Sequence, residues 1–236
     1  MDFEFAEAER AFIAEVRAFV ASNRAQDEAD GVFAPNREAD SMLADSEARR
    51  AFNRRLSEAG YLGMSWGEQY GGQDRDGIYD YLLNEELASV GAPLIGKGVG
   101  CVGKTLIAHG SEKLKQEFLP EILAGAIEFA LGYSEPGAGS DLASMKLKAE
   151  RKGDEYILNG TKMWTTSAHF ADWYWVAART DPSASKHKGI SVFLIPMDHP
   201  GLTITEIKTM GDHRTNQVFF DDVHVHEDYR VGEENK

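Results

Sequence analysis

The sequence predicts a multidomain α and β protein, in which an all-α helical domain is followed by an antiparallel β-barrel domain. Through the first half, apolar residues recur every three or four positions, which is typical of amphipathic helices. Beyond Gly125, aromatic and β-branched residues instead form short runs with turn residues between them. Because no long helical pattern separates these runs, we expect neighbouring strands to pair mainly antiparallel, as in a barrel or a sandwich. We therefore place the boundary at about residue 125, with domains at 1–125 and 126–236.

Each helix of the first domain is predicted by an apolar pattern and an end signal. The first helix carries one apolar stripe, formed by Phe5, Phe12, Val16, Phe19 and Val20. Residues 46–59 are good helix formers, and Gly60 follows them where a C-terminal cap belongs. Residues 77–90 repeat the helical spacing and are followed by Gly91. Ser111 is the expected N-terminal cap of a further helix.

The strands of the second domain are predicted at eight runs, namely residues 127–134, 145–152, 155–158, 161–167, 172–180, 189–197, 202–208 and 216–223. Gly153-Asp154 separates two of these runs as a turn. Asn159-Gly160 is a strong hairpin signal, because both residue types tolerate a positive φ. We therefore expect a tight turn at that position as well.

Charge and composition exclude several classes of protein. The net charge of −14 argues against nucleic acid or an anionic membrane as a general partner, because both would be repelled. Cys101 is the single cysteine, so no disulfide can form within the chain. The acidic N-terminus does not resemble a signal peptide, and no apolar run approaches the ~18 residues of a membrane span. We expect a cytoplasmic protein without membrane association.

Residues 98–105 match the phosphate-loop pattern, with Lys104 and Thr105 at its end. A working phosphate loop needs a buried strand before it and a helix after it. Pro93 lies five residues upstream and leaves little room for a strand. We therefore predict that this segment binds no nucleoside triphosphate.

Two further segments have the residue types of a ligand site. Residues 131–141, LGYSEPGAGSD, open from a strand into a Gly-rich turn that allows a ligand to approach the backbone, although many such segments are ordinary wide turns. The segment lacks the Gly-x-Ser-x-Gly order of a serine-hydrolase elbow. In the predicted strand 161–167, Trp164 and Thr166 share one face, which suits a flat heteroaromatic ligand. The alternative is a core Trp with a Thr packed against it.

No metal site is predicted. The seven histidines are scattered, and only His224 and His226 share a strand face. No third ligand is fixed by the sequence, and nothing resembles zinc-ligand spacing.

Four ordered motifs together resemble the acyl-CoA dehydrogenases. Residues 131–141 resemble the signature of the family's middle domain, and 159–166 resemble its second flavin motif. Residues 110–120 are similar to the helix that leads into the first motif. Residues 219–225 are similar to the strand that ends the middle domain. The segment 211–216 departs from the family's common pattern, so no site residue is carried over there.

The resemblance implies a flavoenzyme of lipid metabolism and fatty acid β-oxidation. The family binds FAD and oxidises the Cα–Cβ bond of acyl-CoA thioesters, with a carboxylate taking the α-proton and the flavin taking the β-hydride. By similarity, residues 131–134 contact the pyrimidine edge of the flavin, and Ser140 lies near the FAD pyrophosphate and the CoA arm. Trp164 lies against the isoalloxazine, and Thr166 binds near N5. The cofactor-binding residues implied are Leu131, Gly132, Tyr133, Ser134, Gly139, Ser140, Trp164, Thr165 and Thr166, with Ser140 also a substrate contact.

The resemblance also implies partners and a missing base. An acyl-CoA thioester is the expected substrate, electron-transfer flavoprotein the acceptor, and the full-length protein a homo-oligomer. The family's base is a glutamate on a C-terminal helical bundle, which we expect beyond Lys236. We therefore expect this chain alone to be inactive and to hold FAD weakly or not at all.

Two alternatives remain open. The fold also suits a flavin monooxygenase or oxidase, which the oxygen reactivity of the reduced flavin would distinguish. A non-catalytic thioester-binding or assembly subunit is the other. The sequence does not reveal which acyl group is taken.

Overall fold

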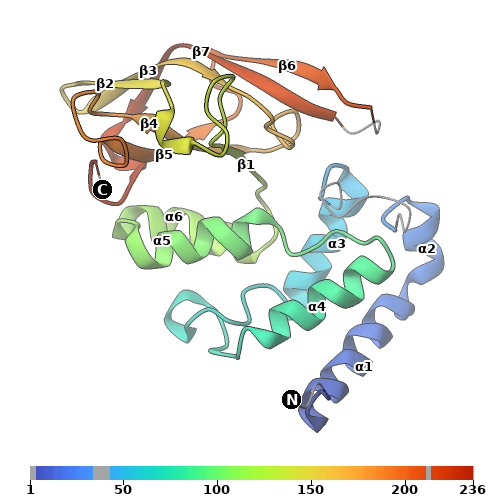
Figure 1. Ribbon diagram of the computed structural model, residues 1–236. Coiled ribbons are helices and arrows are strands. Elements are labelled where there is room, and N and C mark those ends of the chain that lie inside the picture. The colour runs from blue at the N-terminus through green and yellow to red at the C-terminus, as the bar shows by residue number, and fades with distance from the viewer. Residues whose placement is uncertain (1–3, 34–42, 211–213, 236) are drawn as a thin grey trace. The chain divides into compact units, whose positions relative to one another are not determined.

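The computed structural model describes residues 4–33, 43–210 and 214–235, with helices in the first half and strands in the second (Figure 1). The main helices are α1 (Glu7–Ser22), α2 (Arg24–Ala29), α3 (Glu47–Glu58), α4 (Ile78–Ser89), α5 (Lys104–His109) and α6 (Glu112–Leu123). The strands are β1 (Phe129–Gly132), β2 (Lys148–Lys152), β3 (Glu155–Lys162), β4 (Trp173–Arg179), β5 (Ile190–Pro196), β6 (Leu202–Lys208), β7 (Arg214–His226) and β8 (Arg230–Val231). The prediction of a multidomain protein with helices before strands is confirmed.

The predicted helix ends are confirmed by their local geometry. The Ser111 hydroxyl accepts a hydrogen bond from the Leu114 N–H at 3.2 Å, so it caps α6. Gly60 and Gly91 follow α3 and α4 with φ angles of 77° and 67°, the left-handed conformation that ends many helices. The buried residues of α1 are Phe12, Val16 and Val20, all members of the predicted stripe.

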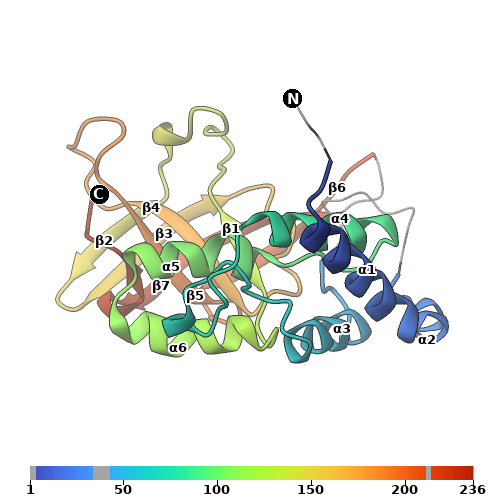
Figure 2. The same cartoon turned by 90° about the horizontal axis from the view of Figure 1, so that it is seen from below.

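The chain divides into two compact units, one formed by residues 1–100 with 120–126 and the other by 101–119 with 127–236. In the second unit, α5 and the first part of α6 lie along one face of the sheet (Figures 1 and 2). There the ring of Phe118 packs edge-on against Trp173, with centroids 4.7 Å apart. The Tyr229 hydroxyl donates to a Glu117 carboxylate oxygen at 3.0 Å.

The eight strands form one mixed sheet in the order β6-β7-β3-β2-β4-β5-β8, with β1 paired to β4. Most neighbours are antiparallel, as predicted, but β1 and β4 run parallel, and β2 meets β4 in parallel at one residue pair. The prediction of a closed barrel was wrong, because the pairings among the described strands form an open path from β6 to β8. Short apolar runs in a sequence indicate individual strands. Whether the sheet closes into a barrel depends on pairing between strands that are distant in sequence.

The predicted hairpin at Asn159-Gly160 was also wrong. Strand β3 continues through both residues and pairs with β7 along its length, with a bulge between Leu158 and Gly160. At this bulge Gly160 takes a φ of 145°, a conformation that L side chains rarely adopt. The Asn159 side chain donates to Asp222 at 2.9 Å and accepts from the Asp222 N–H at the same distance. The β2–β3 turn lies at Gly153, as predicted.

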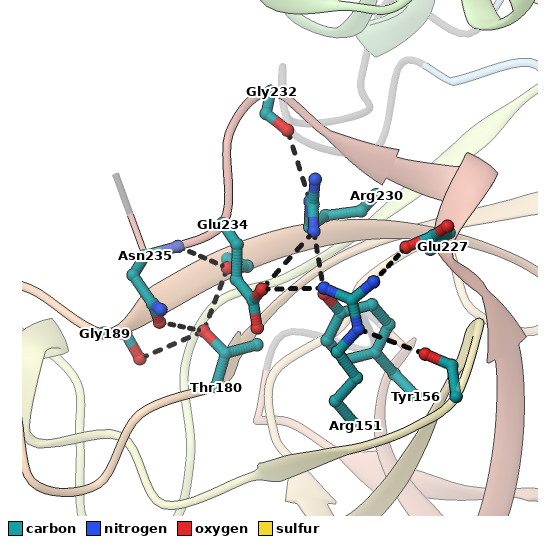
Figure 3. Close-up of polar contacts among 11 residues, drawn as sticks. Arg151, Tyr156, Thr180, Gly189, Glu227, Arg230, Gly232, Glu234 and Asn235 are labelled. Carbon is teal, nitrogen blue, oxygen red and sulfur yellow. Dashed lines mark hydrogen bonds and ion pairs between the residues drawn. The ribbon is translucent and has the colours of Figure 1, made fainter.

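The segment after β7 is fastened to the sheet by a polar network (Figure 3). The Arg151 guanidinium bonds Glu227 and lies 3.3 Å from a Glu234 carboxylate oxygen. The Arg230 guanidinium donates to the Tyr156 hydroxyl at 2.7 Å. These contacts fix the course of the chain after its last long strand.

The segment that matches the phosphate-loop pattern has the wrong setting for that function. Residues Gly98–Gly103 form a π-helical stretch that continues into α5. In the described chain, no strand lies between α4 and this stretch. The structure therefore lacks the strand–loop–helix setting, while the absence of triphosphate binding stays a prediction.

Candidate functional site

The two motifs singled out in the sequence meet in the second compact unit. The loop after β1 and the loop after β3 are joined by a hydrogen bond from the Met163 N–H to the Ser134 carbonyl at 2.9 Å. The Lys162 ammonium donates to the Tyr133 carbonyl, also at 2.9 Å. Residues almost thirty positions apart in sequence therefore build one framework.

A buried ion pair lies beneath this junction. The Lys162 ammonium lies 2.9 Å from a Glu135 carboxylate oxygen, and the two side chains are 0% and 6% exposed. Glu135 also accepts the N–H groups of Lys146 at 2.6 Å and Leu147 at 2.9 Å. Burial lowers the pKa of Lys162, and the Glu135 carboxylate opposes this effect. The pair is thus hydrogen-bonded on both sides, which is the condition for burying charge without a large loss of stability.

The first motif begins where β1 runs parallel to β4, with Leu131 opposite Trp175. A Cβ atom on Gly132 would come within 2.6 Å of the Tyr174 ring, so this position requires glycine. The Tyr133 hydroxyl accepts a hydrogen bond from the Trp175 indole N–H at 2.7 Å, and burial raises the pKa of Tyr133. The Tyr133 ring is therefore held within the fold.

The motif then makes a tight turn. Glu135 and Ala138 exchange backbone hydrogen bonds of 2.8 and 3.1 Å, and Gly139 and Ser140 follow on the surface. A Cβ atom on Gly139 would meet nothing within 4 Å, so space is open beside the backbone. A pocket of about 310 Å³ borders the turn, lined by Glu135, Pro136, Gly137, Ser144, Lys146, Leu147, Gly160 and Thr161.

The second motif is a loop, and the prediction that Trp164 and Thr166 share a strand face was wrong. Strand β3 ends at Lys162, and Trp164 adopts a φ of 63° in the left-handed region. The Trp164 side chain is 56% exposed, which also contradicts the core-residue alternative. After Lys162 the chain departs from the direction of β3, and Thr165 makes hydrogen bonds to residues of other strands. Its N–H donates to the Asn216 carbonyl, and its buried hydroxyl bonds the Tyr174 hydroxyl, both at 2.9 Å.

The polar groups at the surface of this framework are available to a ligand. Within the described residues, the hydroxyls of Ser134, Ser140 and Thr166 have no hydrogen-bond partner. Thr165, by contrast, is only 1% exposed, and its hydrogen bonds join the loop to Asn216 and Tyr174. The predicted site residues therefore fall into three groups, which are exposed (Gly139, Ser140 and Trp164), partly buried (Leu131, Tyr133, Ser134 and Thr166) and buried (Gly132 and Thr165).

Sequence reasoning missed two residues of the site, Lys162 and Asn216. Both are 0% exposed and hold the motif loops from below. Lys162 lies inside the second motif, but β3 ends there as Asn-Gly-Thr-Lys, so no apolar pattern marks this lysine as buried. Asn216 gave no signal either, because a single Asn at the start of a strand has no periodic pattern.

Two family models cover most of the chain. The N-terminal domain of acyl-CoA dehydrogenase matches residues 6–126, and the middle domain of acyl-CoA dehydrogenase matches residues 130–223. The chain belongs to the acyl-CoA dehydrogenase family. The middle-domain match contains every predicted site residue of both motifs.

Similar acyl-CoA dehydrogenases occur in Mycobacterium tuberculosis (strain ATCC 25618 / H37Rv). Acyl-CoA dehydrogenase FadE29 is 47% identical over 189 residues, which are 80% of this chain and 49% of that protein. Acyl-CoA dehydrogenase IpdE1 is 40% identical over 226 residues, 94% of this chain and 58% of that protein. The chain thus spans about half the length of the relatives it matches.

Solved acyl-CoA dehydrogenase structures show the same fold. The Tcur3481-Tcur3483 steroid ACAD has a TM-score of 0.89 and 38% identity, covering 100% of this chain and 59% of that one. The glutaryl-coenzyme A dehydrogenase glutaryl-CoA complex has a TM-score of 0.77 and 30% identity, with the same coverage.

Two kinds of feature are absent from the part of the chain that the structure describes. No helix there combines the length and apolar character needed to cross a bilayer. No group of three or more His, Cys, Asp or Glu side chains there could hold a metal ion.

Proposed function

We propose that the whole protein to which this chain belongs carries out FAD-dependent α,β-dehydrogenation of acyl-CoA thioesters. The observation that carries the proposal is the joined pair of loops, in which Trp164 stands exposed in a left-handed conformation. A large exposed aromatic held in a strained conformation is a recurrent mark of a ligand site. The family membership supports FAD as the ligand.

The residues of the two loops fit FAD. Trp164 offers an exposed aromatic face for the isoalloxazine, and the Thr166 hydroxyl has no partner among the described residues. The backbone of residues 131–134 and the Ser134 hydroxyl would contact the pyrimidine edge. Gly139 and Ser140 would lie at the diphosphate, with Ser140 also near the CoA arm. When bound, FAD accepts the hydride that leaves Cβ of the thioester.

The base and the partners belong to the same proposal. We assign the base to no residue of this chain, and we expect it on a part of the whole protein that residues 1–236 do not include. FAD would then be held weakly by this chain alone. Electron-transfer flavoprotein as acceptor, homo-oligomeric assembly, a cytoplasmic location and a role in fatty acid β-oxidation stay predictions.

The acyl group is open to a directed test. Because the Tcur3481-Tcur3483 steroid ACAD is similar over the whole chain, a steroid thioester belongs in any substrate panel. Straight-chain thioesters of several lengths and glutaryl-CoA complete it. The substrate with the highest kcat/KM defines the class.

The proposal is tested on the full-length protein loaded with FAD. Anaerobic addition of substrate should bleach the flavin band, and an artificial acceptor should restore it. No bleaching with any thioester would favour a non-catalytic subunit. Rapid reoxidation by oxygen would favour an oxidase or monooxygenase.

Thr166→Val tests the assigned site at constant volume. It removes one hydrogen bond, worth about 0.5–1.5 kcal/mol. We expect the flavin spectrum or reduction potential to change while the thermal midpoint stays nearly constant. An unchanged flavin with a large loss of stability would contradict the site.

A further inference from the structure

Asn216 lies at the start of β7, is fully buried, and grips the loop that carries Trp164. Its carbonyl accepts the Thr165 N–H at 2.9 Å, and its Nδ2 donates to the Thr165 carbonyl at 2.8 Å. The same Nδ2 lies 3.4 Å from the Thr166 carbonyl and 3.1 Å from Nδ1 of His169. One side chain thus reaches three residues of a single loop.

The opposite end of the amide is also used. The Asn216 Oδ1 accepts from the Arg214 guanidinium Nε at 3.0 Å. The site therefore needs a donor toward the loop and an acceptor toward Arg214. A carboxamide supplies both, whereas aspartate would set an oxygen against the Thr165 carbonyl, and alanine would supply neither group.

These bonds explain how Trp164 keeps its conformation. The preceding residue is fixed through its N–H to the Ser134 carbonyl, and the following residue is fixed by Asn216 and Tyr174. A left-handed φ in a non-glycine residue persists only where the surroundings determine it. Asn216 supplies two of the contacts on the far side of Trp164, one from its backbone and one from its side chain.

We infer that Asn216 is a positioning residue of the flavin site, because its side-chain amide holds the loop that presents Trp164 and Thr166 to the isoalloxazine. The inference rests on the proposed function. Asn216 is buried beneath the loop, so it acts through Trp164 and Thr166 rather than as a catalytic residue.

The test uses the full-length, FAD-loaded protein and the variants Asn216→Asp and Asn216→Ala. The matched control is Thr215→Val, since Thr215 is the buried neighbour whose hydroxyl has no partner among the described residues. We expect both Asn216 variants to shift the flavin potential and to lower kcat about tenfold, with KM for the thioester within about twofold. Thr215→Val should leave the flavin potential, kcat and KM at the values of the parent protein.

A double-mutant cycle separates positioning from general destabilisation. If Asn216 acts through the loop, Asn216→Ala should change the flavin potential less in a Thr166→Val background than in the parent protein. Additive changes would overturn the inference. If Asn216→Ala does not fold, Asn216→Ser takes its place. A serine variant with the flavin potential and kcat of the parent protein would also overturn the inference.

The possible outcomes separate a failure of the Asn216 inference from a failure of the proposed function on which it rests. A protein that binds no FAD, or a flavin indifferent to both Thr166→Val and the Asn216 variants, overturns both proposals. A flavin that responds to Thr166→Val but responds to the Asn216 variants no more than to Thr215→Val overturns only the positioning role.

Discussion

Trp164 shows at the residue scale how this site departs from ordinary packing. Most large aromatic residues bury their area in the core, and Tyr156, Tyr174 and Trp175 do so here. Trp164 is 56% exposed and lies in a backbone region that L-residues avoid. Neither feature favours folding, and the proposed contact between the indole and the flavin would account for both.

Trp164→Gly and Trp164→Ala separate strain from ligand binding. Both remove the exposed indole, but only alanine retains the Cβ atom that makes a left-handed φ costly. We expect the glycine variant to be about 1 kcal/mol more stable than the alanine variant. Both should weaken FAD binding in the full-length protein to the same degree. Denaturant titration and FAD titration measure the two effects, and an alanine variant as stable as the glycine one would contradict a left-handed Trp164.

At the residue scale, the Lys162–Glu135 ion pair should also contribute strongly to the free energy of unfolding. Lys162→Met leaves the Glu135 carboxylate buried without its cation, which costs about 3–5 kcal/mol. Lys186→Met is the matched control, because Lys186 pairs with Asp141 at the surface, with side chains 54% and 56% exposed. We expect the control to leave the urea midpoint close to that of the parent protein, because exposed ion pairs contribute little to stability. Equal losses in urea titrations would show that the Lys162 pair is hydrated.

At the scale of elements, the sequence predicted what local chemistry decides. Ser111 caps α6 and Gly60 ends α3 through contacts within a few residues, so their patterns were sufficient. Asn159-Gly160 has the residues of a hairpin turn, yet β3 passes through it. There the long-range bonds between Asn159 and Asp222 prevail over the local signal.

Gly160→Ala tests this bulge. The φ of 145° is unsuited to L-residues, and the new Cβ would lie 3.0 Å from the Leu147 Cα. We expect a loss of about 1–3 kcal/mol. Gly137→Ala is the control, since its Cβ would meet nothing within 4 Å and its φ is not positive, and it should stay within about 1 kcal/mol of the parent. Thermal unfolding of both variants gives the comparison, and a neutral Gly160→Ala would argue for a regular strand.

At the scale of the whole molecule, contiguous motifs were predictable and distant supports were not. The first motif and the Trp164 segment each carry their residue types within about ten positions, so their place in the chain was visible. Their joining through Ser134 and Met163, and the support from Asn216, depend on the order of strands in the sheet. The same dependence explains why an open mixed sheet was predicted as a closed barrel.

The extent of the second folding unit yields the last prediction. The sequence places a boundary near residue 125, whereas residues 101–119 group with the sheet. Phe118 is 1% exposed, and its ring lies 4.7 Å from that of Trp173. A fragment that begins at residue 126 would lack this ring and uncover its partner.

We therefore expect the fragment 101–236 to unfold at a higher temperature than the fragment 126–236. Loss of a buried Phe side chain costs about 3–5 kcal/mol, which lowers the midpoint of a domain of this size by roughly 10 °C or more. Phe118→Ala in the longer fragment should reproduce much of the loss, because it removes the ring and keeps the rest of α5 and α6. Calorimetry of the three proteins decides the matter. Equal midpoints for the two fragments would place the folding boundary near residue 125, with the helices as an accessory to a sheet that is stable without them.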